Sequence, residues 1–151
     1  MLLAAATLAG CATANKVEAT KNTSVTPFLM FEGNAEEALN FYVSLLPDSR
    51  VVSITRYGPG EAGREGTVRQ AVFSLAGQRI MCIDSPIKHN FTFTPATSMF
   101  VDCATENQLD ELFAKLSDGG QVMMPLGQYD FSRKFAWIAD RFGVSWQLNL
   151  P

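Results

Sequence analysis

The sequence has few of the residues that build disulfide frameworks and metal centres. Its 151 residues include three cysteines and one histidine, and no two cysteines form a C-x-x-C pair. Three thiols cannot all pair, so neither a disulfide framework nor a cysteine-based zinc site is expected. An excess of positive charge is also missing, because 12 basic residues stand against 15 acidic ones, for a net charge of -3. Without a basic patch, the chain is not expected to bind nucleic acid.

The apolar residues that are present are enough for one compact domain. Hydrophobic residues make up 47% of the sequence and charged residues 18%, which is the balance of an ordinary globular protein. A chain of this length and composition can bury a substantial core in a single domain. We therefore expect one domain, and neither a coiled-coil, a collagen-like nor a disordered class.

The first 14 residues are small and apolar, and they contain Leu8-Ala9-Gly10-Cys11. This stretch resembles a bacterial lipobox, in which the signal before the cysteine is removed and the cysteine becomes the lipid-bearing N-terminus. We therefore predict lipidation at Cys11, a signal and tether over residues 1–24, and a location on the periplasmic side of the bacterial cell envelope. Residues 1–11 are too few for a membrane-spanning helix, which takes about 20.

The match to a lipoprotein signal is incomplete, because no lysine or arginine precedes the apolar run and the run is short. Two alternatives stay open: the true start lies upstream, or the segment is not a signal and the protein is cytoplasmic. In the second alternative Cys11 carries no lipid.

Apolar patterns in the first half predict a strand, a helix and three further strands. The stretch 25–32 is apolar and is followed by Gly33 and Asn34. Asn34 is the expected N-cap of the helix, with Glu37 three residues later as in a capping box. Strands separated by glycine-rich turns are then expected over 51–56, 67–75 and 78–84.

The second half repeats this plan. A strand is expected over 98–102, and Thr105, 71 residues after Asn34, is the expected cap of a second helix. Counted from each cap, the apolar residues fall at the same offsets of 4, 7, 8 and 11. They are Ala38, Phe41, Tyr42 and Leu45 in the first helix, and Leu109, Leu112, Phe113 and Leu116 in the second. This agreement indicates a degenerate duplication.

The C-terminal stretch alternates between polar and apolar side chains, as a strand with two different faces does. The polar face has Ser145, Gln147 and Asn149, and the apolar face has Val144, Trp146 and Leu148. We expect a helix to cover the apolar face and the polar face to line a cavity.

Aligning the last strands of the two halves, 80–84 with 145–149, places Cys82 opposite Gln147 across the presumed cleft, with Asp84 beside it. Cys82 is then a candidate for covalent or redox chemistry, although a nearby carboxylate raises the pKa of a thiol and lowers its reactivity. The alternative is a small apolar residue that fills space in a strand.

Four segments resemble the vicinal oxygen chelate superfamily, which includes glyoxalase I, bleomycin-resistance proteins and extradiol dioxygenases. They are Phe41-Tyr42, LPDS at 46–49, FSLAGQ at 73–78 and DRFGVSWQ at 140–147. The similarity is greatest to the PhnB-like branch, often described as 3-demethylubiquinone 3-methyltransferases. The resemblance implies an α+β fold of two βαβββ modules, at 25–86 and 95–151, that form an open barrel around a cleft. It also implies a homodimer.

Metal-dependent members of the superfamily place four ligands, His, Gln or Glu, on the first and fourth strands of each module. The matching first strands here offer no imidazole and no carboxylate, only Pro27, Leu29 and Phe31, and Ala96, Ser98 and Phe100. A divalent site needs about four protein donors, or three with an open position, and at most Cys82, Asp84 and Gln147 come together. The single histidine, His89, is expected to be a solvated loop residue. We therefore expect no metal and no cofactor.

Residues 58–63 match G-x-G-x-x-G but are not expected to bind a dinucleotide. That motif works where its glycines open a helix whose N-terminal amides face the phosphates, and here another strand follows. A mobile hairpin loop is expected instead, able to close over an anionic ligand with Arg56, Arg64 and Arg69. No segment has the glycine-rich strand-to-helix turn that holds a methyl donor, so methyl transfer is not expected.

The sequence thus predicts a metal-free, small-molecule-binding protein of the vicinal oxygen chelate fold. Its cleft is expected to be lined by Cys82, Asp84, Ser98, Trp137, Gln147 and Asn149. One alternative is a metal-dependent lyase, isomerase or dioxygenase that holds its ion with Cys82, Asp84 and Gln147. Another is an envelope-tethered interaction module without a ligand.

Overall fold

The computed structural model describes residues 23–151. The predicted lipid attachment at Cys11 and almost all of the predicted signal and tether lie outside the described residues. Within 23–151, no helix is both long enough and apolar enough to cross a membrane.

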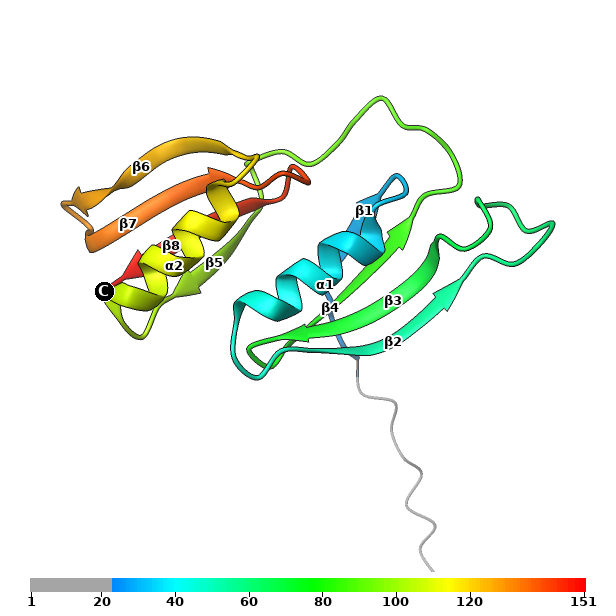
Figure 1. Ribbon diagram of the computed structural model, residues 1–151, viewed down its shortest axis with the longest axis horizontal. Coiled ribbons are helices and arrows are strands. Elements are labelled where there is room, and N and C mark those ends of the chain that lie inside the picture. Colours follow the sequence, from blue (N-terminus) through cyan, green and yellow to red (C-terminus); the bar gives the residue numbers. More distant parts are fainter. Residues whose placement is uncertain (1–22) are drawn as a thin grey trace, which may run out of the picture.

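Each half of the domain folds as a β-α-β-β-β module (Figure 1). Module one contains β1 (Phe28–Phe31), α1 (Ala35–Leu45), β2 (Arg50–Arg56), β3 (Val68–Leu75) and β4 (Gln78–Asp84). Module two contains β5 (Ser98–Asp102), α2 (Glu106–Ser117), β6 (Gln121–Tyr129), β7 (Ser132–Ala139) and β8 (Ser145–Leu150). The predicted α+β fold of two modules is confirmed.

The two sheets have the same strand order. It is β1-β4-β3-β2 in module one and β5-β8-β7-β6 in module two. The first strand of each module pairs in parallel with the last, and all other pairs are antiparallel. The last strand of each module therefore lies inside its sheet, with neighbours on both sides.

Helix α1 is capped from the far end of its own module. Asn34 occupies the predicted N-cap position, but its side chain makes no capping hydrogen bond, so only the predicted side-chain cap is wrong. Instead Asp84, the last residue of β4, accepts hydrogen bonds at Oδ1 from the Gly33 and Ala35 N–H groups, at 2.6 and 3.0 Å. Its Oδ2 accepts one from the Val68 N–H at 2.9 Å. A buried carboxylate thus joins the start of α1 to β3 and β4.

Helix α2 starts as the sequence predicts. The Thr105 hydroxyl accepts a hydrogen bond from the Gln108 N–H at 3.2 Å, and the Gln108 side-chain oxygen accepts one from the Ala104 N–H at 2.8 Å. This reciprocal arrangement closely resembles a capping box. The predicted apolar stripe packs against the sheet through three buried leucines, Leu109, Leu112 and Leu116.

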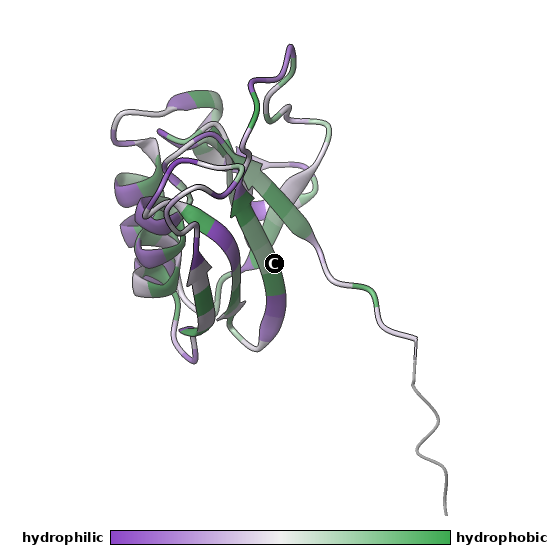
Figure 2. Cartoon of the chain, turned by 90° about the vertical axis from the view of Figure 1, so that its right-hand side faces the viewer, coloured by the Kyte–Doolittle hydropathy of each residue, from purple (hydrophilic) through white to green (hydrophobic). Residues whose placement is uncertain are grey.

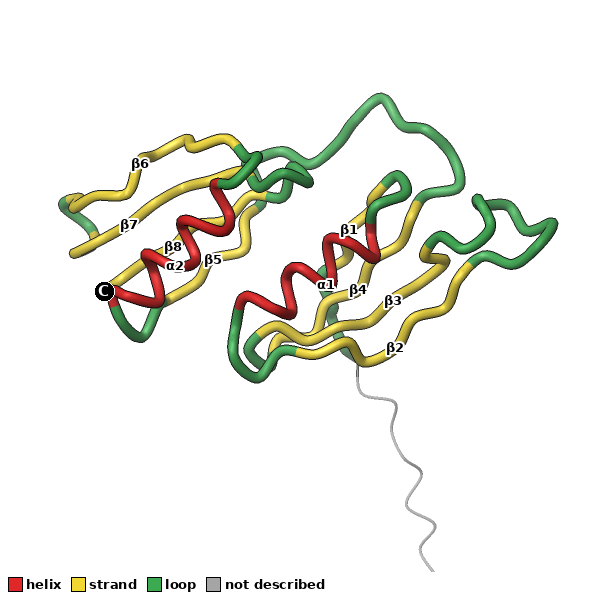
Figure 3. The backbone as a smooth tube through the Cα atoms, in the orientation of Figure 1, coloured by secondary structure: helices red, strands yellow, loops and turns green. Residues whose placement is uncertain are grey.

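Both helices lie on the same side of the sheets, and the opposite sheet faces carry no further layer (Figure 2, Figure 3). Two phenylalanines on these uncovered faces are more than half exposed, Phe28 in β1 at 51% and Phe100 in β5 at 57%. Residues 85–97 connect the modules as a loop between β4 and β5 (Figure 3). The fold thus leaves an open and partly apolar surface on the side away from the helices.

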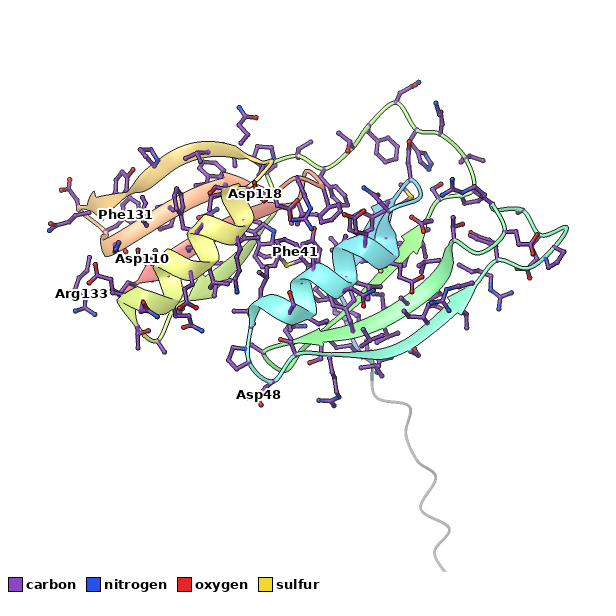
Figure 4. The ribbon with its side chains drawn as sticks, in the orientation of Figure 1. Phe41, Asp48, Asp110, Asp118, Phe131 and Arg133 are labelled. Carbon is purple, nitrogen blue, oxygen red and sulfur yellow. The ribbon has the colours of Figure 1, made fainter. Side chains whose placement is uncertain are left out.

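The two modules share one hydrophobic core. The ring centre of Trp146 in β8 lies 5.2 Å from that of Tyr42 in α1, and the Phe142 ring lies 6.0 Å from Tyr42 and 6.1 Å from Phe41. The Arg141 guanidinium stands 4.0 Å from the centre of the Phe41 ring, which is a cation–π arrangement. Phe41 lies where the modules meet (Figure 4). The turn before β8 therefore packs on the helix of module one.

Candidate functional site

A connected group of polar side chains lies on the uncovered face of module two. The Ser98 and Ser145 hydroxyl oxygens are 2.7 Å apart. The Trp137 indole N–H donates to Ser145 Oγ at 2.9 Å, and the Gln147 amide donates to Ser98 Oγ at 3.2 Å. We call these four residues, Ser98, Trp137, Ser145 and Gln147, the polar ladder.

Strand register places the polar ladder on a single face. Trp137 pairs with Gln147 between β7 and β8, and Ser98 pairs with Ser145 between β5 and β8. Paired residues project to the same side of a sheet, as do alternate residues of one strand. Asn149 follows on the same side and donates to Asp102 Oδ1 at 2.6 Å. The intervening residues of β8 are buried on the helix side, as the alternation in the sequence predicts.

Cys82 does not face the open side, which corrects the sequence prediction. It is fully buried, pairs with Leu29 and Ala71 on the neighbouring strands, and belongs to the hydrophobic core under α1. Burial raises the pKa of the Cys82 thiol to about 12, and the charge of Asp84 acts in the same direction. The thiol is therefore neutral and inaccessible at neutral pH, so it fills space and is not a nucleophile.

Asp84 is not a cleft residue either. Its side chain is buried, and its oxygens accept three backbone N–H groups at the start of α1 and of β3. The set Cys82, Asp84 and Gln147 is therefore not brought together, because the first two face the helix of module one and Gln147 faces the open side of module two. The residues proposed for the alternative metal enzyme do not form a site.

The alignment of Cys82 with Gln147 is one residue out of register. Cys82 is buried on the helix side of the module-one sheet, and Leu148 is buried on the helix side of the module-two sheet. Leu148 is therefore the counterpart of Cys82. Because side chains alternate along a strand, a shift of one residue exchanges the two faces. The same exchange affects β1, where Phe31, expected on the cleft face, lies in the core under the helix and Phe28 is the exposed residue of the strand.

Metal ligands do not gather elsewhere in the part of the chain that the structure describes. Within residues 23–151, no three His, Cys, Asp or Glu side chains lie close enough together to hold an ion. His89 is partly buried rather than free in solvent, and its Nε2 lies 2.8 Å from Ser85 Oγ.

A cavity of about 820 Å³ lies at the junction of the modules. Its walls come from the end of β1, from the loop 85–97 and from the turn before β8. The lining includes Phe28, Met30, Phe31, Glu32, Arg64, His89, Phe91, Phe93 and Phe142. A smaller cavity of about 240 Å³ shares Phe28 and Phe93 with it and reaches Ser98 and Ser145 of the polar ladder. Sequence reasoning missed this junction, although two phenylalanines in a polar loop were a usable signal.

The fold defines the class of protein. Two β-α-β-β-β modules with helices on one side and an open side opposite are the arrangement of the vicinal oxygen chelate superfamily, and the chain has that fold. The fosfomycin resistance protein FosX from Mesorhizobium loti has the same fold, with a TM-score of 0.54 over 85% of this chain and 91% of that one. The two sequences are 9% identical, so this likeness concerns the fold alone.

Within that superfamily the match is much closer. The model of the family described as 3-demethylubiquinone-9 3-methyltransferase matches residues 23–149, and the chain belongs to this family. A putative 3-demethylubiquinone-9 3-methyltransferase, PhnB protein, from Bacillus cereus is 56% identical, with a TM-score of 0.84 over 85% of this chain and all of that one. Protein YjdN of Escherichia coli is 22% identical over 139 residues, which are 83% of this chain and 94% of YjdN.

Proposed function

We propose that the protein binds a small organic molecule on the uncovered side of its sheets, without a metal ion. The observation that carries this proposal is the polar ladder, four hydrogen-bonded side chains on a sheet face that no helix or second sheet of the described chain covers. Binding sites of this kind combine an apolar surface with a few fixed polar groups. The hydrogen bonds hold Trp137 and Gln147 in place, which lowers the entropy cost of binding.

The polar ladder retains hydrogen-bonding capacity for a ligand. Gln147 contacts Ser98 through its amide nitrogen, and a primary amide has two N–H donors and an oxygen acceptor. The neighbouring Trp137 ring supplies an apolar surface beside that amide. A molecule with a planar apolar body and a neutral polar group therefore fits this face.

Neither strand-to-helix turn is free to hold a methyl donor. In the turn before α1, the Gly33 and Ala35 N–H groups already donate to Asp84. In the turn before α2, Thr105 and Gln108 complete the cap between themselves and the backbone. We therefore do not extend the reaction in the family's description to this chain.

We further propose that a second copy of the chain completes the cleft. The open faces expose Phe28 and Phe100 by more than half, and no helix or second sheet of residues 23–151 covers them. Light scattering during size-exclusion chromatography of the Cys11→Ser variant is expected to give about twice the chain mass of 16.5 kDa. A single-chain mass at all concentrations contradicts this assembly.

We also propose that Cys11 carries a lipid that tethers the protein to the cell envelope. The support is the lipobox-like stretch that ends at Cys11. Expressed in a bacterium, the full chain is expected to incorporate labelled palmitate and to sediment with membranes, whereas Cys11→Ser does neither. An unprocessed and unlabelled chain in the soluble fraction contradicts the tether.

A thermal-shift screen with small acids, phenolics and antibiotics tests the binding function. A ligand that binds only the folded state raises the unfolding temperature by mass action. Gln147→Leu is expected to lower the affinity for each hit about tenfold, because it removes roughly one well-formed hydrogen bond to the ligand. Gln128→Leu, on the exposed edge of β6, is the matched control and is expected to leave binding unchanged.

Two results contradict the proposal. One is equal affinity of Gln147→Leu and the unaltered chain for every hit, which removes the polar ladder from the site. The other is a stoichiometric divalent ion in protein purified without a chelator, which contradicts binding without a metal ion.

A further inference from the structure

Arg64 is an arginine without an ion pair in the wall of the 820 Å³ junction cavity. Its neighbours on either side, Arg56 and Arg69, are each paired with a glutamate. No ion pair within residues 23–151 includes Arg64. Its guanidinium lies against Gly33, where an added Cβ would stand 3.2 Å from Nη2. A positive charge with no protein partner thus lies beside the end of β1.

The backbone that carries Arg64 is held in position. The Arg64 carbonyl oxygen accepts hydrogen bonds from the N–H and the hydroxyl of Thr67, at 3.1 and 2.6 Å. The preceding residue, Gly63, packs so closely on the Tyr57 ring that a Cβ at Gly63 would overlap it. The backbone at Arg64 is therefore in place before a ligand arrives, although Arg64 is an exposed residue, and less backbone conformational entropy is lost on binding.

Glu32 supplies the opposite charge in the same cavity wall. Its Oε1 accepts the His89 main-chain N–H at 3.0 Å, and no ion pair within residues 23–151 includes Glu32. His89 is itself held by Ser85, and its ring lies 4.8 Å from that of Phe91, measured between centroids. The carboxylate is thus placed by the loop 85–97, near Arg64 but too far from it to form an ion pair.

The remainder of the wall includes five phenylalanines beside polar residues such as Asn34, Asn90 and Thr92. The phenylalanines are Phe28, Phe31, Phe91, Phe93 and Phe142. A simple anion would be attracted by Arg64 and repelled by Glu32. A simple cation would be attracted by Glu32 and repelled by Arg64. A molecule that carries both charges close together satisfies both residues, because charge-assisted hydrogen bonds are stronger than neutral ones.

We propose that the junction cavity binds a zwitterionic amino acid with an aromatic or large aliphatic side chain. Its carboxylate contacts Arg64, its ammonium group contacts Glu32, and its side chain packs among the phenylalanines. The cavity volume of about 820 Å³ lies within the range of small-molecule sites. No residue of the polar ladder lines this cavity, so this second site does not depend on the first.

Calorimetric titration with three related probes tests the charge pattern. The probes are L-phenylalanine, 3-phenylpropionate, which lacks the ammonium group, and 2-phenylethylamine, which lacks the carboxylate. L-phenylalanine is expected to bind about tenfold more tightly than either analogue, the effect of one charge-assisted contact. Equal affinity for L-phenylalanine and 3-phenylpropionate overturns the proposal, as does the absence of saturable L-phenylalanine binding at millimolar concentration.

Two variants test the assignment of each charge. Arg64→Gln is expected to weaken the binding of L-phenylalanine about tenfold and to leave the binding of 2-phenylethylamine the same or stronger. Glu32→Gln is expected to weaken L-phenylalanine binding and to leave 3-phenylpropionate binding the same or stronger. The controls Arg79→Gln and Glu111→Gln remove exposed charges outside the cavity and are expected to change nothing. If Arg64→Gln behaves like Arg79→Gln while circular dichroism shows both folded, the cavity is not the site. That outcome would leave the polar ladder proposal standing, because the ladder is tested by Gln147→Leu.

Discussion

Two kinds of polar residue matter for this protein, those that hold the backbone and those that face the open side. Asp140 belongs to the first kind, because its Oδ1 accepts the N–H groups of Phe142 and Val144, at 2.8 and 3.1 Å, and its Oδ2 accepts the Trp146 indole N–H at 2.8 Å. Asp84 does the same for the start of α1. A buried carboxylate is retained where several N–H donors compensate its lost hydration.

Replacing Asp84 tests this structural assignment. Asp84→Asn keeps the shape of the side chain but removes its charge and points an amide donor toward backbone N–H groups. The free energy of unfolding in urea is therefore expected to fall by about 3 kcal/mol. Asp118→Asn, at an exposed position just after α2 (Figure 4), is the control, with an expected change below about 0.5 kcal/mol. Equal losses in the two variants contradict the bonding seen at Asp84.

The two described thiols are expected to be unreactive in the folded protein. Burial raises the pKa of Cys82 to about 12 and that of Cys103 to about 11, so little thiolate exists at pH 7. In the Cys11→Ser variant, a thiol reagent is expected to modify neither cysteine until urea unfolds the chain. Fast labelling of native protein at pH 7 contradicts this.

The same shifts give a direction for the pH dependence of stability. Both folded-state pKa values lie above the unfolded thiol value of about 8.5. The stability that the neutral thiols contribute is therefore fully present below about pH 8.5 and decreases as the pH rises toward the folded values. Urea unfolding midpoints measured from pH 7 to pH 10 are expected to fall in the upper part of that range.

At the scale of elements, two helices with the same apolar spacing begin in different ways. Helix α2 has a local cap, Thr105, whose hydroxyl accepts the N–H of Gln108. Helix α1 depends on Asp84, which is 49 residues away from Ala35 in the sequence. A local cap forms with its own helix, whereas a remote cap requires the sheet to be in place.

Paired substitutions distinguish the two kinds of cap. Thr105→Ala removes the hydroxyl acceptor and is expected to lower the free energy of unfolding by about 1 kcal/mol. Asn34→Ala, at the equivalent position of α1, is expected to cost less than about 0.5 kcal/mol, because Asn34 makes no capping bond. Urea titrations that rank these variants in the opposite order contradict the assignment of the caps.

At the scale of the whole molecule, the modules are joined by aromatic contacts as well as by the loop 85–97. Phe142, Arg141 and Trp146 of module two meet Phe41 and Tyr42 of module one. Because of this shared burial, we expect the two modules to unfold as one unit. It also sets the positions of the two uncovered faces and of the junction cavity between them.

Truncating Phe142 tests the joint. Phe142→Ala removes contacts to both Phe41 and Tyr42 and is expected to lower the free energy of unfolding by about 2 kcal/mol, while unfolding remains a single transition. Phe131→Ala is the comparison, because Phe131 is 66% exposed at the far end of module two (Figure 4). This substitution is expected to lower the free energy of unfolding by about 1 kcal/mol or less. Separate unfolding of two modules in the unaltered protein contradicts a shared core.

The sequence by itself determined the two-module α+β fold, because the apolar offsets after each helix start and the alternation in β8 are local patterns. Those patterns also identified the polar face that carries Ser145 and Gln147. Only the tertiary structure decided that Cys82 faces the helix, that Asp84 caps α1, and that Phe142 reaches Phe41 across the joint. Each depends on the register between strands or on contact between modules, and a shift of one residue in that register reverses the face on which a side chain lies.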